Sequence, residues 1–491
     1  SQTWVRQPFP GNKIPISRIS PAALLVQALY PLPQLKQNFN NYNVFGASTS
    51  NTNEWDVKID HSFSDSDRLT VRYSEHDSSN QQPSAFGYAA GGGPQPGTLG
   101  PGNIISNPGR QAVVNYVHIF GPRATNDLNL GWQNQYPKRV IPGYGNISNF
   151  DLGIHGMPNG GQKLGTPYFS FNNFEALGAT TDTTFLEWQT QDTLSDTFSL
   201  NMGRHNIRIG GTARKLLTNN LQPGAINTAW YFNTDFTNQP GIANTGFDYA
   251  GFLLGLPYQM NYSIFPDYFR SRASVYGLFA QDDFHVSRNL TLNLGVRWDV
   301  PLWYHEALNR SGVFDLTQGQ YAQFGQNGFR TTPWNYDIAN IDPRFGFAWN
   351  PLGNSKLVLR GGYGIFTVGL DDAGATGFMS TSPIFADSDQ GRYTTVDQIH
   401  WLTTLDTIPY TPIDKTGKAS KSVTVFPDHN PMAYLQQWNM NVQTQVKTIL
   451  VEVGYVGTRG SHLSYGSYNL NAIPVSQARQ AQGQFVSPYV P

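Results

Sequence analysis

The chain has no cysteine among its 491 residues. Disulfide bonds, cysteine-held iron–sulfur clusters and thiolate zinc sites are therefore excluded, and an oxidising compartment is compatible with the sequence. Charged residues are also scarce, at 13% of the sequence with a formal net charge of -1. Because a nucleic-acid-binding protein leaves a basic stripe in its sequence, we expect no nucleic-acid partner.

Long apolar runs are missing as well. No stretch of roughly 18 or more apolar residues occurs, which excludes a membrane-spanning helix but not strands of about 10 alternating residues. Helical periodicity is confined to residues 21–30, where Ser20 is a suitable N-cap and Pro21 suits the first turn. There is no start methionine and no basic-then-apolar leader, so we expect either a removed signal peptide or a fragment.

Aromatic residues, glycine and proline are plentiful. The sequence holds 13% aromatic residues, 49 Gly and 32 Pro, with a mean hydropathy of -0.39. Low charge with many aromatic residues is typical of a barrel whose strands place apolar residues on lipid and polar residues in a lumen. A disordered chain would lack these aromatic residues. The length exceeds a typical domain of roughly 100 to 200 residues, but no stretch resembles a linker, which favours one continuous architecture.

Strict alternation of apolar and polar residues predicts antiparallel hairpins. The clearest strand covers 290–300, with Leu290, Leu292, Leu294, Val296, Trp298 and Val300 on one face. It follows a strand at 274–286. Further hairpins are expected at 55–63 with 69–73, 113–120 with 125–135, 188–200 with 205–216, 344–349 with 357–366, and 436–446 with 449–455. These give about twelve strands, and weaker candidates near Trp230, Tyr258 and Tyr393 would raise the number to about sixteen.

Short and long connections tend to alternate along the chain. The long ones, at 78–109, 137–184, 218–272 and 367–432, are rich in Gly, Pro, Asn and Ser. Outer-membrane barrels have short periplasmic turns and long extracellular loops. A soluble antiparallel sheet with one solvated face would also alternate, but soluble sandwiches rarely need long loops at one end only.

The apolar faces are rich in aromatic residues near strand ends, as interfacial girdles require. The candidates are Trp55, Tyr73, Trp132, Trp188, Trp298, Trp349, Trp438 and Tyr455. We therefore predict an all-β protein, an antiparallel transmembrane β-barrel in contact with outer-membrane lipid.

Several sequence phrases carry a family resemblance. They are the Pro-Phe-Pro-Gly-Asn-Lys-Ile-Pro run at 8–15, the segments at 53–65, 67–69, 281–284 and 290–299, Asp-Pro-Arg-Phe-Gly at 342–346, and the run at 454–462. In these phrases the chain resembles the Oar-like TonB-dependent receptors, which have a carboxypeptidase-regulatory-like N-terminal domain. The resemblance implies location in the bacterial outer membrane, a barrel of about 22 strands, a plug, and a TonB-type energy-coupling protein that binds the N-terminal region.

The same resemblance implies that residues 1–491 are only a partial barrel. The Pro-Phe-Pro-Gly-Asn segment is similar to a loop already inside the barrel domain, so the N-terminal domain, the plug and the first strands are expected to be absent. The last strands are expected to be absent too, because the chain ends in Ser-Pro-Tyr-Val-Pro and proline removes a ladder donor.

No constellation of catalytic acid, base or nucleophile stands out, so we expect no enzyme activity and no cofactor. The scattered His61, His118 and His205 favour structural or solvated roles over metal ligation. Neighbouring carboxylates on a strand point to opposite faces, which disfavours the Asp282-Asp283 pair as a proton-sharing site. Asp371-Asp372, in a glycine-containing loop, could help to bind a cation or could simply be solvated.

Two other short motifs suggest special sites only weakly. The acidic turn 65–67 fits a periplasmic hairpin better than a calcium loop. The glycine clusters at 91–93 and 361–364 lack the helix and the Lys-Ser/Thr of a phosphate loop.

Arginines on the polar faces of the predicted strands are the most informative charged residues. A basic residue facing lipid at mid-membrane would cost about 2–4 kcal/mol, so these side chains are expected to point into the lumen. There they could line a substrate path, contact the plug, or simply be solvated and paired. The candidates are Arg72, Arg208, Arg214, Arg297 and Arg360.

These observations predict an outer-membrane receptor that captures a ligand with its extracellular loops and imports it through the barrel. The ligand could be a peptide, a glycan or a protein. The alternatives are an adhesion or structural barrel, a conduit for protein export, or a soluble β-rich carbohydrate enzyme, which would need two carboxylates about 5–10 Å apart in a cleft.

Overall fold

The computed structural model describes residues 7–91, 103–178, 184–222, 227–265, 267–334, 338–354, 356–368, 387–393, 404–408, 410, 425–426 and 431–463. The chain forms two compact units. The first comprises Ser1–Phe284, Gly295–Ile341 and Leu370–Asn430, and the second comprises His285–Leu294, Asp342–Gly369 and Pro431–Pro491.

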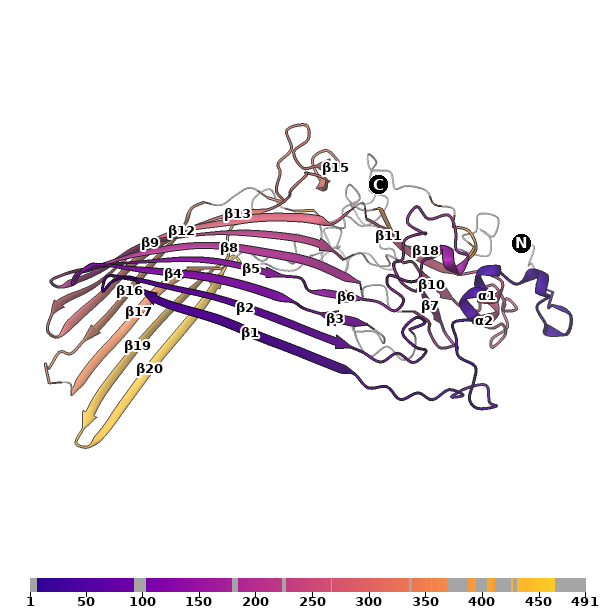
Figure 1. The fold of residues 1–491 in the computed structure, drawn as a ribbon, viewed down its shortest axis with the longest axis horizontal. Coiled ribbons are helices and arrows are strands. Elements are labelled where there is room, and N and C mark those ends of the chain that lie inside the picture. Colours follow the sequence, from indigo (N-terminus) through magenta and orange to yellow (C-terminus); the bar gives the residue numbers. More distant parts are fainter. Residues whose placement is uncertain are drawn as a thin grey trace, which may run out of the picture. The chain divides into compact units, whose positions relative to one another are not determined.

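Long antiparallel strands form most of the first unit, and we call them the wall (Figure 1). Neighbours in the wall follow the order β13 (Leu290–Glu306), β12 (Phe269–Ser287), β9 (His205–Leu221), β8 (Phe185–Met202), β5 (Ala124–Gln135), β4 (Gly109–Gly121) and β2 (Asp67–Gln81). β1 (Thr49–Ser62) also pairs with β2, and the short β3 (Ile104–Ser106) and β6 (Lys138–Val140) extend the sheet.

The second unit holds four antiparallel strands in the order β16 (Asn340–Trp349, which enters this unit at Asp342), β17 (Leu357–Thr367), β19 (Tyr434–Val446) and β20 (Ile449–Ser461). Asp342 is buried, and its carboxylate accepts hydrogen bonds from Thr367 N at 2.8 Å and from Thr367 Oγ1 at 2.9 Å. This clamp joins the start of β16 to the end of β17. It gives the Asp-Pro-Arg-Phe-Gly motif a structural role.

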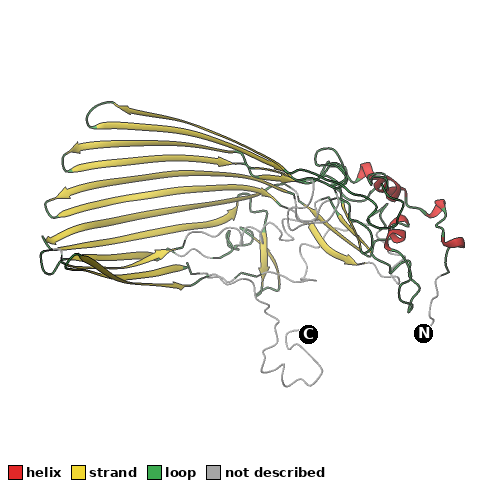
Figure 2. Cartoon of the chain, turned by 90° about the horizontal axis from the view of Figure 1, so that it is seen from below, coloured by secondary structure: helices red, strands yellow, loops and turns green. Residues whose placement is uncertain are grey.

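Every predicted hairpin is present, with longer strands than alternation alone predicted. The strand expected at 205–216 continues to Leu221, and the one expected at 290–300 continues to Glu306. The connections within hairpins are short (Figure 2), and those between hairpins are long, as predicted. A further long connection, 307–339, was not singled out from the sequence; it holds β14 (Gly312–Asp315) and β15 (Gln320–Gln323).

The predicted helix is also confirmed. α1 spans Pro21–Gln27, and Ala23 N donates to Ser20 Oγ at 3.1 Å, the N-cap bond expected there. The other helical segments are α2 (Asp248–Leu253) and the 3-10 turns η1 (Pro10–Asn12), η2 (Ile16–Arg18) and η3 (Phe150–Leu152). None of the helices in the described ranges is both long and apolar enough to cross a membrane.

The weaker strand candidates are confirmed as strands, but they lie in a second sheet. The candidates near Trp230, Tyr258 and Tyr393 are strands, but they do not add to the wall. They belong to a separate four-stranded sheet of β7 (Tyr168–Phe171), β10 (Ala229–Phe232), β11 (Gln259–Ile264) and β18 (Asp387–Tyr393). Wall strands are long and alternating, whereas these are short, and β7, β10 and β11 bury side chains in a core of their own.

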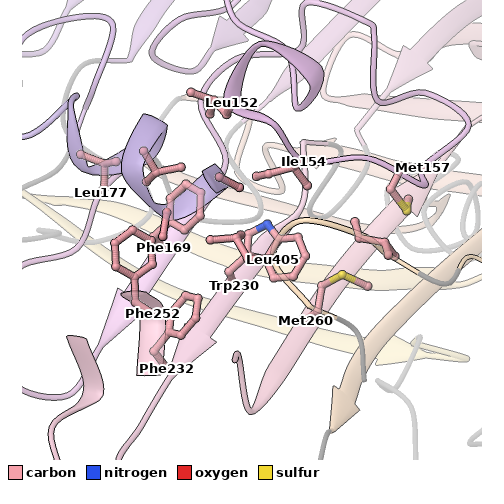
Figure 3. Close-up of a cluster of buried hydrophobic side chains, with 14 of the residues drawn as sticks. Leu152, Ile154, Met157, Phe169, Leu177, Trp230, Phe232, Phe252, Met260 and Leu405 are labelled. Atoms are coloured by element: carbon pink, nitrogen blue, oxygen red, sulfur yellow. The ribbon is translucent and has the colours of Figure 1, made fainter. Parts of the chain in front are cut away.

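This small sheet packs with α1 and α2 around a buried cluster of apolar side chains, and we call the sheet, both helices and residues 404–408 the cap. Figure 3 shows Trp230, Phe169, Phe232 and Phe252 at its centre, all of them essentially inaccessible to solvent. Trp230 Nε1 donates to Thr228 Oγ1 at 2.8 Å, so the indole N–H is satisfied. The long connections are thus folded around a core.

Contacts between distant parts of the chain close the cap. Ser20 Oγ donates to Asp406 Oδ1 at 2.8 Å, and Ala22 N donates to the same oxygen at 2.9 Å. Leu405 N donates to Gly255 O at 3.0 Å. These bonds tie the start of α1 and the end of α2 to the segment 404–408.

Candidate functional site on the two faces of the wall

The apolar face of the wall is exposed. Leu194, Ile209 and Leu278 lie on the same face of β8, β9 and β12, and Leu278 is 58% accessible. A water-soluble protein rarely leaves so continuous an apolar surface uncovered. Contact with acyl chains accounts for it, because barrel strands place alternate apolar residues on lipid.

The aromatic girdle candidates lie on this apolar side of their strands, but not all lie at strand ends. Trp132 and Trp298 are within β5 and β13, and Trp55 contacts the ring of Tyr73 at 5.4 Å. Tyr73 and Trp438 are half-buried, while the exposed members are Trp55, Trp132, Trp188, Trp298, Trp349 and Tyr455. Their assignment to membrane interfaces stays a prediction.

The polar face carries arginines that are paired with carboxylates. Arg72 Nε lies 3.2 Å from Asp56 Oδ1, and Arg208 Nη2 lies 3.1 Å from Asp283 Oδ2. The arginine side chains are therefore held in place on the face opposite the exposed aliphatic residues.

Arg297 makes the tightest of these pairs. Its Nε and Nη2 each donate to Asp299 at 2.7 Å, and Nη2 also donates to Thr212 Oγ1 at 3.3 Å. Two parallel charge-assisted bonds fix the guanidinium plane. The other two candidates have no carboxylate partner within the part of the chain that the structure describes. Arg360, in the second unit, donates from Nη1 to Gln443 Oε1 at 3.3 Å. Arg214, in the first unit, is exposed. That these arginines face a lumen stays a prediction.

The sequence did not reveal that two histidines pair with aspartates on the apolar side, near the short turns. His205 Nδ1 lies 2.7 Å from Asp282 Oδ2, and the imidazole stacks on Phe284 at 4.3 Å. His118 Nδ1 similarly lies 2.6 Å from Asp67 Oδ1. Only the cross-strand register, in which Phe284 faces His205 and Asp67 faces His118, could have revealed these pairs.

Asp282 and Asp283 lie on opposite faces of β12, as alternation requires, and bond to different residues of β9, His205 and Arg208. Asp371 and Asp372 lie outside the described residues. Among the residues that the structure describes, no group of three His, Asp or Glu side chains could hold a metal ion.

The glycine clusters have packing roles where the structure describes them. A Cβ on Gly361 would lie 2.6 Å from Phe347 Cε1, and one on Gly91 would lie 2.9 Å from Gly178 O. Gly361 is inside β17. Close approach of neighbouring atoms therefore explains both glycines.

Electrostatics in the cap region follow from burial and local ion pairing. The Lys163 ammonium and the Ser148 hydroxyl hydrogen-bond to Asp151 and lower the pKa of its carboxyl to about 2. Burial raises the pKa of the Tyr249 phenol to about 12 and raises the pKa of Tyr30 as well. These groups keep one protonation state at neutral pH.

The model of the outer membrane beta barrel domain matches residues 1–491. The chain belongs to this family of outer-membrane β-barrel proteins. This outer-membrane barrel therefore has an all-β, mostly antiparallel fold and is located in the bacterial outer membrane, as predicted.

The solved structures that are similar to this outer-membrane barrel match it at low TM-score and low sequence identity. The outer membrane transporter YddB from Escherichia coli has a TM-score of 0.47 at 11% identity, over 83% of this chain and 40% of its own. The ferric-catecholate import receptor Fiu from E. coli K12 has a TM-score of 0.39 at 10% sequence identity, and the match covers 83% of this chain and 51% of Fiu. The ferric yersiniabactin uptake receptor FyuA from Yersinia pestis has a TM-score of 0.39 at 8% sequence identity, and the match covers 84% of this chain and 45% of FyuA.

This outer-membrane barrel spans about half or less of the length of those proteins. No curated protein sequence matches the chain.

Proposed function

We propose that the chain is part of an Oar-like TonB-dependent receptor, which captures a ligand with its extracellular connections and imports it through the barrel. The cap carries this proposal. Its connections are folded around a core that includes Trp230 and Phe252, both fully buried. A folded capture surface loses little conformational entropy when a ligand binds, because its side chains are already ordered.

The polar face of the wall supports a route for the ligand. Three of its arginines are paired with carboxylates: Arg297 with Asp299, Arg72 with Asp56 and Arg208 with Asp283. A hydrated polar ligand could pass such a surface without meeting a large field of one sign. The family resemblance adds a TonB-type energy-coupling protein as partner.

The test uses cells that produce the full-length protein or lack it. Cells would receive fluorescein-labelled peptide and oligosaccharide pools too large for general porins, with and without a protonophore. We expect one pool to accumulate in the periplasm only when the protein and the proton-motive force are both present. A protein whose deletion abolishes cell–cell contact but changes no uptake would be an adhesion barrel, and the receptor proposal would be wrong.

A further inference from the structure

A polar hollow of about 490 Å³ lies across β1, β2, β4 and β5, far along these strands from their short turns. The strand residues that line it from the polar face are Glu54, Asp56, Arg72, Ser74, His76, Gly109, Gln111, Gln133 and Gln135. Trp55, Glu75 and Arg110 also border it, but strand alternation turns these side chains to the opposite face. There the Trp55 ring contacts Tyr73.

Cross-strand register arranges the lining side chains in two rows. Asp56 faces Ser74, Ser74 faces Gln111, and Gln111 faces Gln133. Neighbouring strands are about 4.8 Å apart, so this row presents a carboxylate, a hydroxyl and two amides at regular intervals.

The second row lies one same-face step further along the strands. Glu54 faces His76, His76 faces Gly109, and Gly109 faces Gln135. Gly109 leaves a gap between the imidazole and the amide. A Cβ there would meet Gln135 Cγ at an ordinary 3.6 Å, so packing does not require glycine, and its effect is to deepen the hollow.

The amides of Gln111, Gln133 and Gln135 have no hydrogen-bond partner within the described residues. Each offers two donors and an acceptor. The ionisable side chains that line the hollow, by contrast, are paired with one another. Arg72 is 3.2 Å from Asp56, and His76 Nδ1 is 2.8 Å from Glu54 Oε1.

We propose that this hollow binds a neutral oligosaccharide, an inference that rests on the proposed function and names its substrate class. Sugar hydroxyls donate and accept hydrogen bonds, which matches the free glutamine amides and the carboxylate oxygens beside them. Among the described residues, no apolar side chain on the polar face of the strands lines the hollow, so an apolar peptide side chain would find no partner there. Arg72 is paired with Asp56, and the His76 imidazole bonds to Glu54, so an anionic ligand would meet no unpaired arginine or lysine among the described residues that line the hollow.

The test measures binding to the full-length protein in detergent by calorimetry, with maltohexaose, cellohexaose, xylohexaose and mannohexaose as probes. Gln111→Met and Gln133→Met remove the amides at nearly constant size. We expect at least one sugar to bind, and each variant to weaken its binding about three- to tenfold, because a hydrogen bond is lost. Gly109→Leu should abolish binding by filling the hollow.

The matched control is Gln281→Met, on the polar face of β12 outside the hollow, where the amide donates to Asp283. It should leave sugar binding unchanged, and gel mobility without heating would check that every variant is folded. The inference is wrong if no sugar in the panel binds, or if Gln133→Met and Gly109→Leu bind as tightly as the unmodified protein.

The binding test and the uptake test can fail independently of each other. Energy-dependent uptake of labelled peptides, without sugar binding, would overturn the oligosaccharide site and leave the receptor. Sugar binding that Gln133→Met weakens, without energy-dependent uptake, would support the site and overturn the receptor.

Discussion

Replacing Phe252 with alanine should open the cap and leave the wall intact. Phe252 has no solvent exposure, and its ring meets those of Phe171 at 5.5 Å, Phe232 at 5.4 Å and Tyr249 at 5.1 Å. Truncating a buried phenylalanine costs about 3–5 kcal/mol, because transfer free energy is lost and a cavity remains. At 1.36 kcal/mol for each tenfold change, the open state of the cap gains roughly two to four orders of magnitude in population.

Hydrogen exchange followed by mass spectrometry would measure this change. Amides of β7 and β10 should exchange faster in Phe252→Ala by a factor of that order, whereas amides of β8 in the wall should not change. The matched control is Phe45→Ala, because Phe45 is 99% exposed and its truncation should change neither. If β7 and β10 exchanged at the original rate in Phe252→Ala, the connections would not form a cooperative cap.

Three further predictions concern single contacts. Asp406→Ala removes the acceptor of two hydrogen bonds at the start of α1 and should destabilise the cap by about 1–3 kcal/mol in denaturant titrations; an unchanged midpoint would show that these two bonds do not stabilise the cap. Asp342→Ala leaves the Thr367 N–H without its partner and should speed exchange at the end of β17, whereas equal protection would show that the clamp is dispensable. The lowered pKa of Asp151, about 2, means that its pairing with Lys163 stabilises the fold above about pH 4 and is lost between about pH 4 and pH 2. Because both side chains are nearly half exposed, the effect should be small, and Asp151→Asn should remove this part of the pH dependence of unfolding.

The wall could be predicted from the sequence because its determinants are local. In β13, apolar Leu292, Leu294 and Val296 alternate with polar residues, and the Arg288-Asn289 turn fixes the partner strand. One face then has to meet lipid and the other a polar environment. The pairing of the two strands and the character of their two faces can therefore be predicted without a contact between distant residues.

The cap could not be predicted in this way because its determinants are distant in the sequence. β7 and β10 are four-residue strands that pair in parallel, too short for alternation to predict which strands they pair with. The bond from Ser20 to Asp406 joins residues 386 positions apart. Composition identified these segments as loops, since Gly, Pro and Asn dominate them, but only tertiary packing shows that Trp230 is a core residue.

The polar hollow could be predicted from the sequence only in part. Alternation alone places Asp56, Gln111 and Gln133 on the polar faces of their strands, so the sequence predicts which way each side chain points. Their assembly into a row depends on register, because a slip of one residue in β4 would turn Gln111 to the lipid side and bring Arg110 to the polar side. Such a slip would place a guanidinium where the hollow now has a neutral amide. The tight turn between β4 and β5, at 122–123, sets this register. The neutrality on which sugar recognition depends is therefore fixed at the opposite end of the strands from the hollow itself.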